Sequence, residues 1–207
     1  LLGYGVLDLY PRVGKYGHAC VADIFKKYVD LQGNIQPSFT FLVCNFKKSV
    51  SGSTFLSLSD MNTLFHEAGH MLHMILMKNN YVSSGNTSRD FVEIPSQFHE
   101  NFLSDIKFVR ENFRHYLTKE PMSTTMAENI LHLNKRGEAK SWVRTATASL
   151  YDQDIHGKEI SKFAKNFKLL DSHFEKLFKR YGKLQPTKNR HFVSTWGHLV
   201  GGYDGRY

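Results

Sequence analysis

The sequence predicts a mainly helical α+β protein with one small β-sheet. Strand signals concentrate in the first 46 residues, and from residue 59 onward apolar residues recur at the three- and four-residue spacing of helices. No internal repeat or low-complexity tract interrupts this pattern. With 207 residues and 41% hydrophobic content, the chain is long enough to bury a sizeable core. We therefore expect a folded chain.

The predicted sheet has about three strands. "GVLDLY" alternates, and "FTFLVCNF" is a β-rich run bounded by Pro37 and the loop 47–53. Between them, "GKYGHACVADIF" is the candidate for a further strand. Gly33, Asn34 and Pro37 predict a turn before the last strand. These elements make a small β-rich region, residues 1–58.

Helices are expected over five stretches. The first has Ser59 or Asp60 as its N-cap and runs to Lys78, where the loop "NNYVSSGNTS" ends it. The others cover residues 90–117, 123–135, 138–151 and 157–181. Together they form a helical core, residues 59–190. The last segment, "HLVGGYDGRY", is glycine-rich and falls in a flexible loop region, residues 191–207.

The formal net charge of +8 raises the question of a nucleic-acid partner. Between Lys158 and Arg190, however, the basic residues interleave with an apolar stripe at helical spacing. The stripe consists of Ile160, Phe163, Phe167, Leu170, Phe174 and Leu177. This pattern predicts a core-facing helix with a solvated basic back, and we expect no nucleic-acid partner.

Three further features bear on the cellular setting and on the extent of the chain. No run of about 18 consecutive apolar residues occurs, so we expect a soluble chain without a membrane partner. Cys20 and Cys44 are too few for a disulfide framework, which favours buried thiols in a reducing, cytoplasmic setting. The opening "LLGYGVLDLY" lacks an initiator Met and a signal-peptide pattern, so we expect the interior of a longer polypeptide.

The stretch "LFHEAGHMLH" places three histidines on one face of a helix, within about 60° of one another. His66 and His73 are about 10.5 Å apart along the helix axis, too far for both to reach one ion at Zn–N distances of about 2.1 Å. The site must use an adjacent pair. His66 and His70 form H-E-x-x-H, in which Glu67 can act as general base, whereas the pair His70 and His73 has Met71 in that place. We therefore expect His73 to pack or to support the site.

A catalytic zinc site has three protein ligands, so a third is required. A chance H-E-x-x-H occurs in roughly 2 to 3 of 100 such chains, which keeps a plain polar helix face as the alternative. Glu93, in "RDFVEIPSQFHENF", is the leading candidate. A capping box of Asp90 and Glu93 is its alternative, weakened by Pro95. Gln97 and Glu100 are spaced to orient ligands; for Glu100, an ordinary surface carboxylate is the alternative.

Four blocks of sequence resemble the family of zinc oligopeptidases that includes thimet oligopeptidase, neurolysin and oligopeptidase A. "LFHEAGHMLH" and "DFVEIPSQFHENF" are similar to its zinc-binding segments. "LDLYPRVGKYGHAC" is similar to its strand segment ahead of the zinc helix, and "WGHLVGGYDGRY" to its glycine-rich substrate loop. The resemblance implies a zincin-like catalytic core with an H-E-x-x-H helix, and it implies that residues 1–207 are one catalytic-domain fragment.

The resemblance also implies roles for individual residues. One zinc ion would be held by His66, His70 and Glu93. Glu67 would be the base that activates water, and His198 and Tyr203 would stabilise the oxyanion. Further substrate contacts are implied for Gly201, Gly202 and Tyr207. The alternative for Tyr203 and Tyr207 is that both are packing aromatics beside a turn.

The implied activity is that of a metalloendopeptidase, a hydrolase that cuts internal bonds of short, unstructured peptides. Related specificities are alternatives: release of C-terminal dipeptides, or processing of precursors. A non-catalytic, zinc-containing peptide-binding module is the alternative from another class, and Glu67 argues against it. Short peptides and the rest of the same polypeptide, a helical half that walls a channel, are the implied partners. Ala68 departs from the family, which often has Phe at this position.

Overall fold

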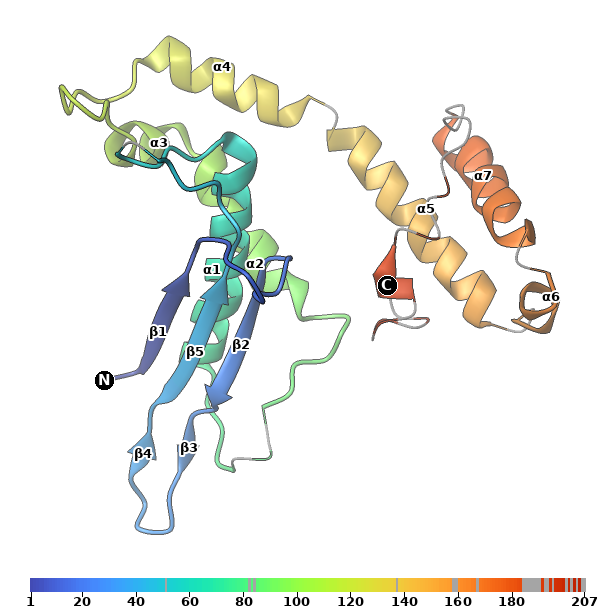
Figure 1. Ribbon diagram of the computed structural model, residues 1–207, viewed down its shortest axis with the longest axis horizontal. Helices are drawn as coiled ribbons and strands as arrows, with labels where there is room; N and C mark the ends of the chain where they lie inside the picture. Colours follow the sequence, from blue (N-terminus) through green and yellow to red (C-terminus); the bar gives the residue numbers. More distant parts are fainter. Residues whose placement is uncertain are drawn as a thin grey trace. The chain divides into compact units, whose positions relative to one another are not determined.

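The computed structural model describes residues 1–207 except 51, 82, 84, 137, 158–159, 167, 184–190, 192–193, 195, 200, 202, 204 and 206–207. The chain forms two compact units, residues 1–127 and 128–207, divided inside the helix Thr124–Lys135 (α4). The strands lie in the first unit, and the second unit is helical (Figure 1). The predicted class, mainly helical with a small sheet, is confirmed.

The main sheet is mixed and has three strands: β1 (Gly3–Asp8), β2 (Cys20–Phe25) and β5 (Ser38–Val43). The central strand, β5, pairs in parallel with β1 and antiparallel with β2 (Figure 1). These are the three predicted strands. Sequence reasoning missed a short ribbon of β3 (Tyr28–Val29) and β4 (Ile35–Gln36).

A tight turn joins the two strands of this ribbon, as the sequence predicted. The Asp30 carboxylate accepts the backbone N–H groups of Gln32 and Asn34 at 3.0 and 2.8 Å. Gly33 has a φ of +83°, a conformation that favours glycine. Side-chain capping by an aspartate thus stabilises a ribbon whose strands are too short to give a period-two pattern.

Helix α1 (Leu58–Leu76) covers one face of the sheet (Figure 1). Side chains alternate along β5, and Leu42 is buried on the face that meets the helix. The core of this unit consists of Leu42, Cys44 and Phe46, with Leu64, Ala68 and Met71 of α1 packed against it. A β-carbon at Gly5 of β1 would lie 2.8 Å from the Met71 Sδ, so strand and helix are in close contact. This packing fixes α1.

Ser57 is the N-cap of α1, so the prediction of Ser59 or Asp60 was wrong. Ser57 and Asp60 form a capping box: the Asp60 N–H donates to Ser57 Oγ (3.1 Å), and the Ser57 N–H donates to Asp60 Oδ2 (3.0 Å). Asp60 is thus the partner of the cap. At the other end the helix stops before the predicted Lys78, because Met77 leaves the helical conformation (ψ 136°).

The single helix predicted over residues 90–117 was wrong. Three short segments replace it: α2 (Glu93–Glu100), the 3-10 turn η1 (Asn101–Ser104) and α3 (Ile106–Asn112). The break falls at Asp105, whose extended backbone and side-chain bond to the Phe108 N–H (2.8 Å) start a new helix. Helix α2 begins at Glu93 without a side-chain cap, so the alternative of a capping box with Asp90 was wrong.

Helix α4, in which the two units divide, matches its predicted range to within one residue. In the second unit, α5 (Glu138–His156) extends beyond its predicted end at residue 151. The predicted helix 157–181 divides into α6 (Ile160–Ala164) and α7 (Lys168–Gly182). Asn166 accounts for the division, because its side chain accepts the Lys168 N–H (3.2 Å) at the start of α7.

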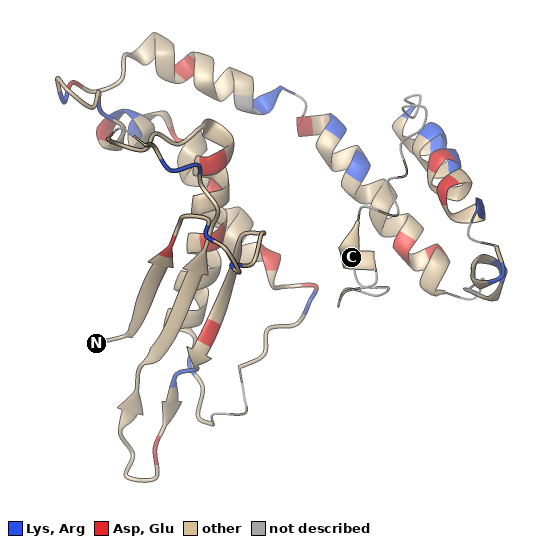
Figure 2. Ribbon diagram, in the orientation of Figure 1, with Lys and Arg blue, Asp and Glu red and all other residues tan. Residues whose placement is uncertain are grey.

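Helix α7 is amphipathic, as its apolar stripe predicted. Phe174 is buried and Leu170 and Leu177 are partly buried in a core that also contains Tyr151 and Ile155 of α5. Four basic residues of α7 are exposed: Lys168, Lys176, Lys179 and Arg180. Figure 2 shows them interleaved with acidic residues. The basic residues of this helix therefore lie on its exposed face, and its opposite face packs in the core.

Both cysteines are free thiols, but the prediction that both are buried holds for Cys44 alone, since Cys20 is only partly buried. Burial raises the pKa of Cys44 to about 11. Among the helices of the described residues, none combines the length and the apolar character that crossing a membrane requires.

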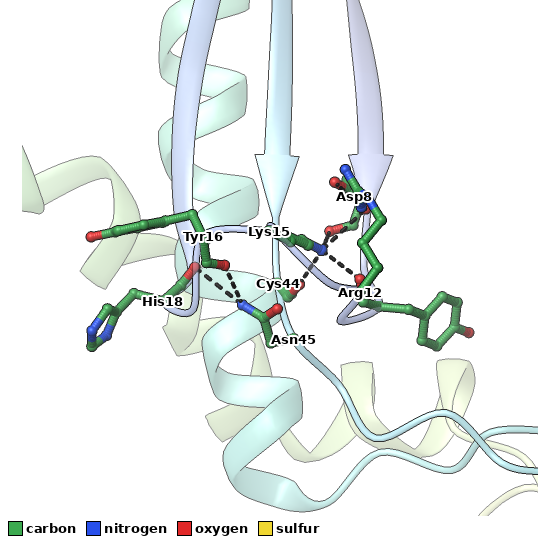
Figure 3. A network of polar contacts seen from close by, with 8 residues as sticks. Asp8, Arg12, Lys15, Tyr16, His18, Cys44 and Asn45 are labelled. Carbon is green, nitrogen blue, oxygen red and sulfur yellow. Dashed lines mark hydrogen bonds and ion pairs between the residues drawn. The ribbon is translucent and has the colours of Figure 1, made fainter.

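A buried lysine fixes the loop between β1 and β2 (Figure 3). The Lys15 side chain is 3% exposed, and its Nζ donates to Asp8 Oδ1 (3.0 Å), to the Asp8 carbonyl (2.9 Å) and to the Tyr10 carbonyl (2.7 Å). It also bonds to the Cys44 carbonyl at the end of β5. Hydrogen bonds from Arg12 and Lys15 hold the pKa of Asp8 below its usual range.

We predict that Lys15→Met lowers the free energy of unfolding by about 3 kcal/mol, because it removes the shared donor of several oxygens that are mostly partly buried. Urea-induced unfolding measures this loss. Arg12→Met is the matched control: Arg12 binds the same Asp8 carboxylate at 2.8 Å, but its side chain is 62% exposed, so its loss should be much smaller. Equal losses in the two variants would contradict a special role for the buried ammonium.

Candidate metal centre

Three side chains converge at the contact between α1 and α2. His66 and His70 lie one turn apart on α1, and Glu93 is the first residue of α2. One ligand atom from each lies within 4.8 Å of the others. The Nε2 atoms of the two histidines are each 3.2 Å from Oε2 of Glu93. The structure therefore brings together the three residues that the sequence predicted as ligands.

The donor set fits a zinc ion. Donor atoms about 2.1 Å from a tetrahedral zinc lie about 3.4 Å apart, close to the two observed distances of 3.2 Å. Two imidazole nitrogens and one carboxylate oxygen are ligands that zinc favours, and three protein ligands leave a fourth position for water or substrate. The cluster is a candidate metal site of the catalytic kind.

Glu67 lies between the two histidines in sequence and is only 7% exposed. Its Oε2 is buried and has no hydrogen-bond partner among the described residues. Burial raises the pKa of this carboxyl, while the charges of His66 and His70 act in the opposite direction. A buried carboxylate oxygen without a partner is suited to accept a proton from a water molecule in the site.

Gly69 allows the two helices to approach closely enough for Glu93 to reach the histidines. A β-carbon at Gly69 would lie 2.7 Å from both the Pro95 carbonyl oxygen and the Ser96 α-carbon, and 2.9 Å from the His99 β-carbon. Such contacts are too short for any residue but glycine unless α2 moves. The glycine that precedes the second histidine therefore sets the position of the third candidate ligand.

Two residues of α2 stabilise this contact. Ser96 is fully buried, and its hydroxyl lies 2.9 Å from the Glu93 carbonyl oxygen and 3.1 Å from Glu93 Oε2. The His99 Nδ1 donates to the Phe65 carbonyl of α1 at 2.8 Å, and the rings of His99 and Phe65 stack 5.3 Å apart. These bonds fix both the helix that carries Glu93 and the Glu93 carboxylate itself.

Glu100 contacts the first of the two histidines. The His66 Nδ1–H donates to Glu100 Oε1 at 2.6 Å, which leaves Nε2 for a metal. Asn62, one turn before His66, donates to the other Glu100 oxygen at 3.0 Å. Burial acts to lower the pKa of His66, but hydrogen bonds to Glu100 and Glu93 outweigh it and raise this pKa to about 10.

His73 and Gln97 were also considered near the site. His73 packs against Phe91, with ring centroids 6.2 Å apart. Gln97 is exposed on α2. Sequence reasoning missed Gly69, Asn62 and His99. Each lies one turn from, or next to, a predicted site residue, so helical spacing around the ligands was the available signal.

The predicted loop residues belong to the second unit. His198 lies in the 3-10 turn η2 (Gly197–Leu199), and its ring centroid is 5.1 Å from that of Tyr203. Gly201 lies in the turn between them, where a β-carbon would come within 2.8 Å of the Gly197 carbonyl. The structure thus brings His198 and Tyr203 together. Two predicted positions, Gly202 and Tyr207, lie outside the described residues.

Comparison with known proteins gives one consistent result. The family model for "Peptidase family M3" matches residues 1–207. The chain is 30% identical to the thimet-like oligopeptidase of Dictyostelium discoideum, over all of this chain and 31% of that protein. It is 31% identical to oligopeptidase A of Salmonella typhimurium and to the human mitochondrial intermediate peptidase, over all of this chain and 31% and 29% of those proteins. The chain thus spans about three tenths of these relatives.

We predict that Gly69→Ala weakens zinc binding by about tenfold or more, because the new methyl group pushes α2 and Glu93 away from the histidines. Chelator competition measures the zinc affinity. Leu72→Ala, at an exposed position of the same helix, is the control and should bind zinc like the parent protein. Unchanged affinity in Gly69→Ala would show that the close contact of the helices does not position the ligand.

We predict that zinc affinity rises with pH between about 6 and 9, because His66, with a pKa of about 10, carries a proton that the metal must displace. Glu100→Gln should lower this pKa and flatten the dependence, and it should also weaken zinc binding by about 10- to 100-fold through loss of orientation. Chelator competition at several pH values measures both effects. The control is Glu111→Gln, an exposed carboxylate of α3. A slope unchanged by Glu100→Gln would refute the role of Glu100.

Proposed function

The chain belongs to peptidase family M3, and we propose that it carries the catalytic core of a zinc-dependent oligoendopeptidase, which hydrolyses internal bonds of short, unstructured peptides. One observation carries the proposal. The donor set of His66, His70 and Glu93 lies beside a buried carboxylate, Glu67, that has an oxygen without a partner among the described residues. A site that only stored zinc would have no use for this proton acceptor.

In the proposed reaction, His66, His70 and Glu93 hold the zinc ion. When bound, zinc acts as a Lewis acid that polarises the peptide carbonyl and lowers the pKa of water. Glu67 accepts a proton from the attacking water and passes it to the leaving amine nitrogen. Because Glu67 is buried, its carboxylate has few competing water contacts and remains available to the reacting molecule.

His198 and Tyr203 are the proposed donors to the oxyanion. Support comes from their chemistry and from their proximity on one loop, with ring centroids 5.1 Å apart. A donor aimed at a developing oxyanion contributes about 3 kcal/mol in a site that excludes water. By resemblance, Gly201, Gly202 and Tyr207 are proposed substrate contacts. Glu100 is proposed to orient His66, and His73 to support the helix that carries the ligands.

Two related specificities are the alternatives. Relatives at similar identity are named for oligopeptidase and for mitochondrial intermediate peptidase activity, so processing of longer precursors is a specific rival. Release of C-terminal dipeptides is the other. An internally quenched peptide with an amidated C-terminus distinguishes oligoendopeptidase activity from release of dipeptides, because an oligoendopeptidase cuts it, whereas a dipeptidyl carboxypeptidase requires the free carboxylate. Cleavage of a precursor alone would favour the processing enzyme.

The proposal extends to the rest of the same polypeptide. The chain spans 31% of the thimet-like oligopeptidase, and we propose that further helical sequence walls a channel that admits short peptides. Cytoplasm is the proposed compartment, supported by two free thiols. Cell fractionation tests this placement, and recovery in mitochondria would contradict it.

We predict that Glu67→Gln lowers kcat for a quenched fluorescent peptide by about 10²- to 10⁴-fold while zinc content stays near one ion per chain, because glutamine keeps the shape but cannot accept the proton. Full-length protein is used for both measurements. Asp60→Asn, at the other acidic residue of α1, serves as the control and should keep activity. Normal cleavage by Glu67→Gln would refute the proposed mechanism.

Zinc analysis of Glu93→Ala tests whether Glu93 is the third ligand of the metal site. The variant should lose zinc and activity together, since two histidines alone are an incomplete site. A zinc content unaffected by this change would place the third ligand elsewhere.

A further inference from the structure

The last turns of α5 contain a buried carboxylate that the proposed reaction does not use. Asp152 is fully buried, with 0% exposure. Its Oδ1 lies 2.8 Å from His156 Nδ1 and accepts the backbone N–H of Gly205 at 3.1 Å. A buried carboxylate is costly unless donors surround it, and these two donors meet that requirement. Asp152 therefore joins α5 to a residue of the glycine-rich loop.

Two neighbouring residues of α5 bind the backbone N–H and the carbonyl oxygen of Gly205. Asp152 accepts its N–H, and the Gln153 side-chain amide donates to its carbonyl. Gly205 has a φ of +71°, which favours glycine, and a β-carbon there would lie 3.5 Å from the His156 β-carbon. The loop backbone thus rests directly on the last turns of α5.

The other end of the loop is fixed by burial. Leu199 is 2% exposed and belongs to the core that contains Tyr151 and Ile155 of α5. His198 is the neighbour of Leu199, and Tyr203 precedes Gly205 by two positions. The two proposed oxyanion donors therefore lie beside the two attachment points of the loop, one apolar and one polar.

We propose that Asp152 is a positioning residue, which holds the Gly205 peptide and His156 and thereby fixes the loop that presents His198 and Tyr203. This inference rests on the proposed function, because it assigns Asp152 to the reaction through the loop. The carboxylate accepts two hydrogen bonds from one oxygen, and its charge strengthens both. A small displacement of an oxyanion donor weakens its effect on the transition state more than substrate binding.

Asp152→Asn in full-length protein tests the proposal. Asparagine keeps the shape and an acceptor oxygen but loses the charge, so folding should be preserved while the loop loosens. We expect kcat/KM for the quenched peptide to fall by about 10- to 100-fold, mainly through kcat, with zinc content unchanged. Amide hydrogen exchange, measured without substrate, should rise over residues 197–207 and stay unchanged over α1.

The matched control is Asp154→Asn, two positions along the same helix. Its side chain is 48% exposed and bonds to His173 at 2.7 Å, so neither kcat nor loop exchange should change. Gln153→Ala should act in the direction of Asp152→Asn, with a smaller effect. The proposal would be overturned if loop exchange were unchanged in Asp152→Asn, or if exchange rose over the whole second unit with kcat unaffected.

Failure of the proposed function would give results that differ from failure of the positioning role of Asp152. In that case the parent protein would cleave no peptide, or Glu67→Gln would cleave it normally. The exchange measurement needs no substrate and still reports whether Asp152 fixes the loop. If the loop loosens in Asp152→Asn but kcat of an active parent protein is unchanged, the attachment is structural only and the positioning role is refuted.

Discussion

The candidate metal centre depends on one contact, the close approach of α1 and α2 at Gly69. Two ligands are set by helical periodicity within α1, but the third comes from another helix, and its position depends on how near the two backbones lie. Because Gly69 has no side chain, the Pro95 carbonyl and the Ser96 backbone pack directly on α1. The bond from His99 to the Phe65 carbonyl then fixes the helix along this contact.

Three glutamates around the centre have different chemistry because their surroundings differ. Glu93 faces the Nε2 atoms of both histidines and is suited to bind a cation. Glu100 faces the opposite nitrogen of His66 and is itself oriented by Asn62. Glu67 is buried and keeps an oxygen without a partner among the described residues, which suits a proton acceptor. Burial and hydrogen-bond partners decide these roles, since the side chain is the same in all three.

Buried charges fix irregular backbone in both units. Lys15 binds backbone carbonyls from Asp8, Tyr10 and Cys44 and holds the loop between β1 and β2. Asp152 accepts the N–H of Gly205 and holds the glycine-rich segment on α5. In each case one ionised group satisfies polar backbone atoms that secondary structure leaves unpaired. The same physical device therefore positions a loop beside the sheet and a loop that carries proposed catalytic residues.

The sequence by itself determined the elements that follow from local periodicity. These are the three strands of the sheet, α1 with His66 and His70 one turn apart, and the amphipathic face of α7. The spacing of Glu93 and Glu100 also indicated their shared helix face. Breaks at Asp105 and Asn166 were missed, because an aspartate or asparagine inside an apolar pattern reads equally well as an exposed helical residue until its backbone conformation is known.

Only the tertiary structure decided how near Glu93 comes to the histidines, that Gly69 permits this approach, and that Asp152 binds Gly205. These contacts join residues 23 or more positions apart, and no periodic pattern encodes a distance between separate elements.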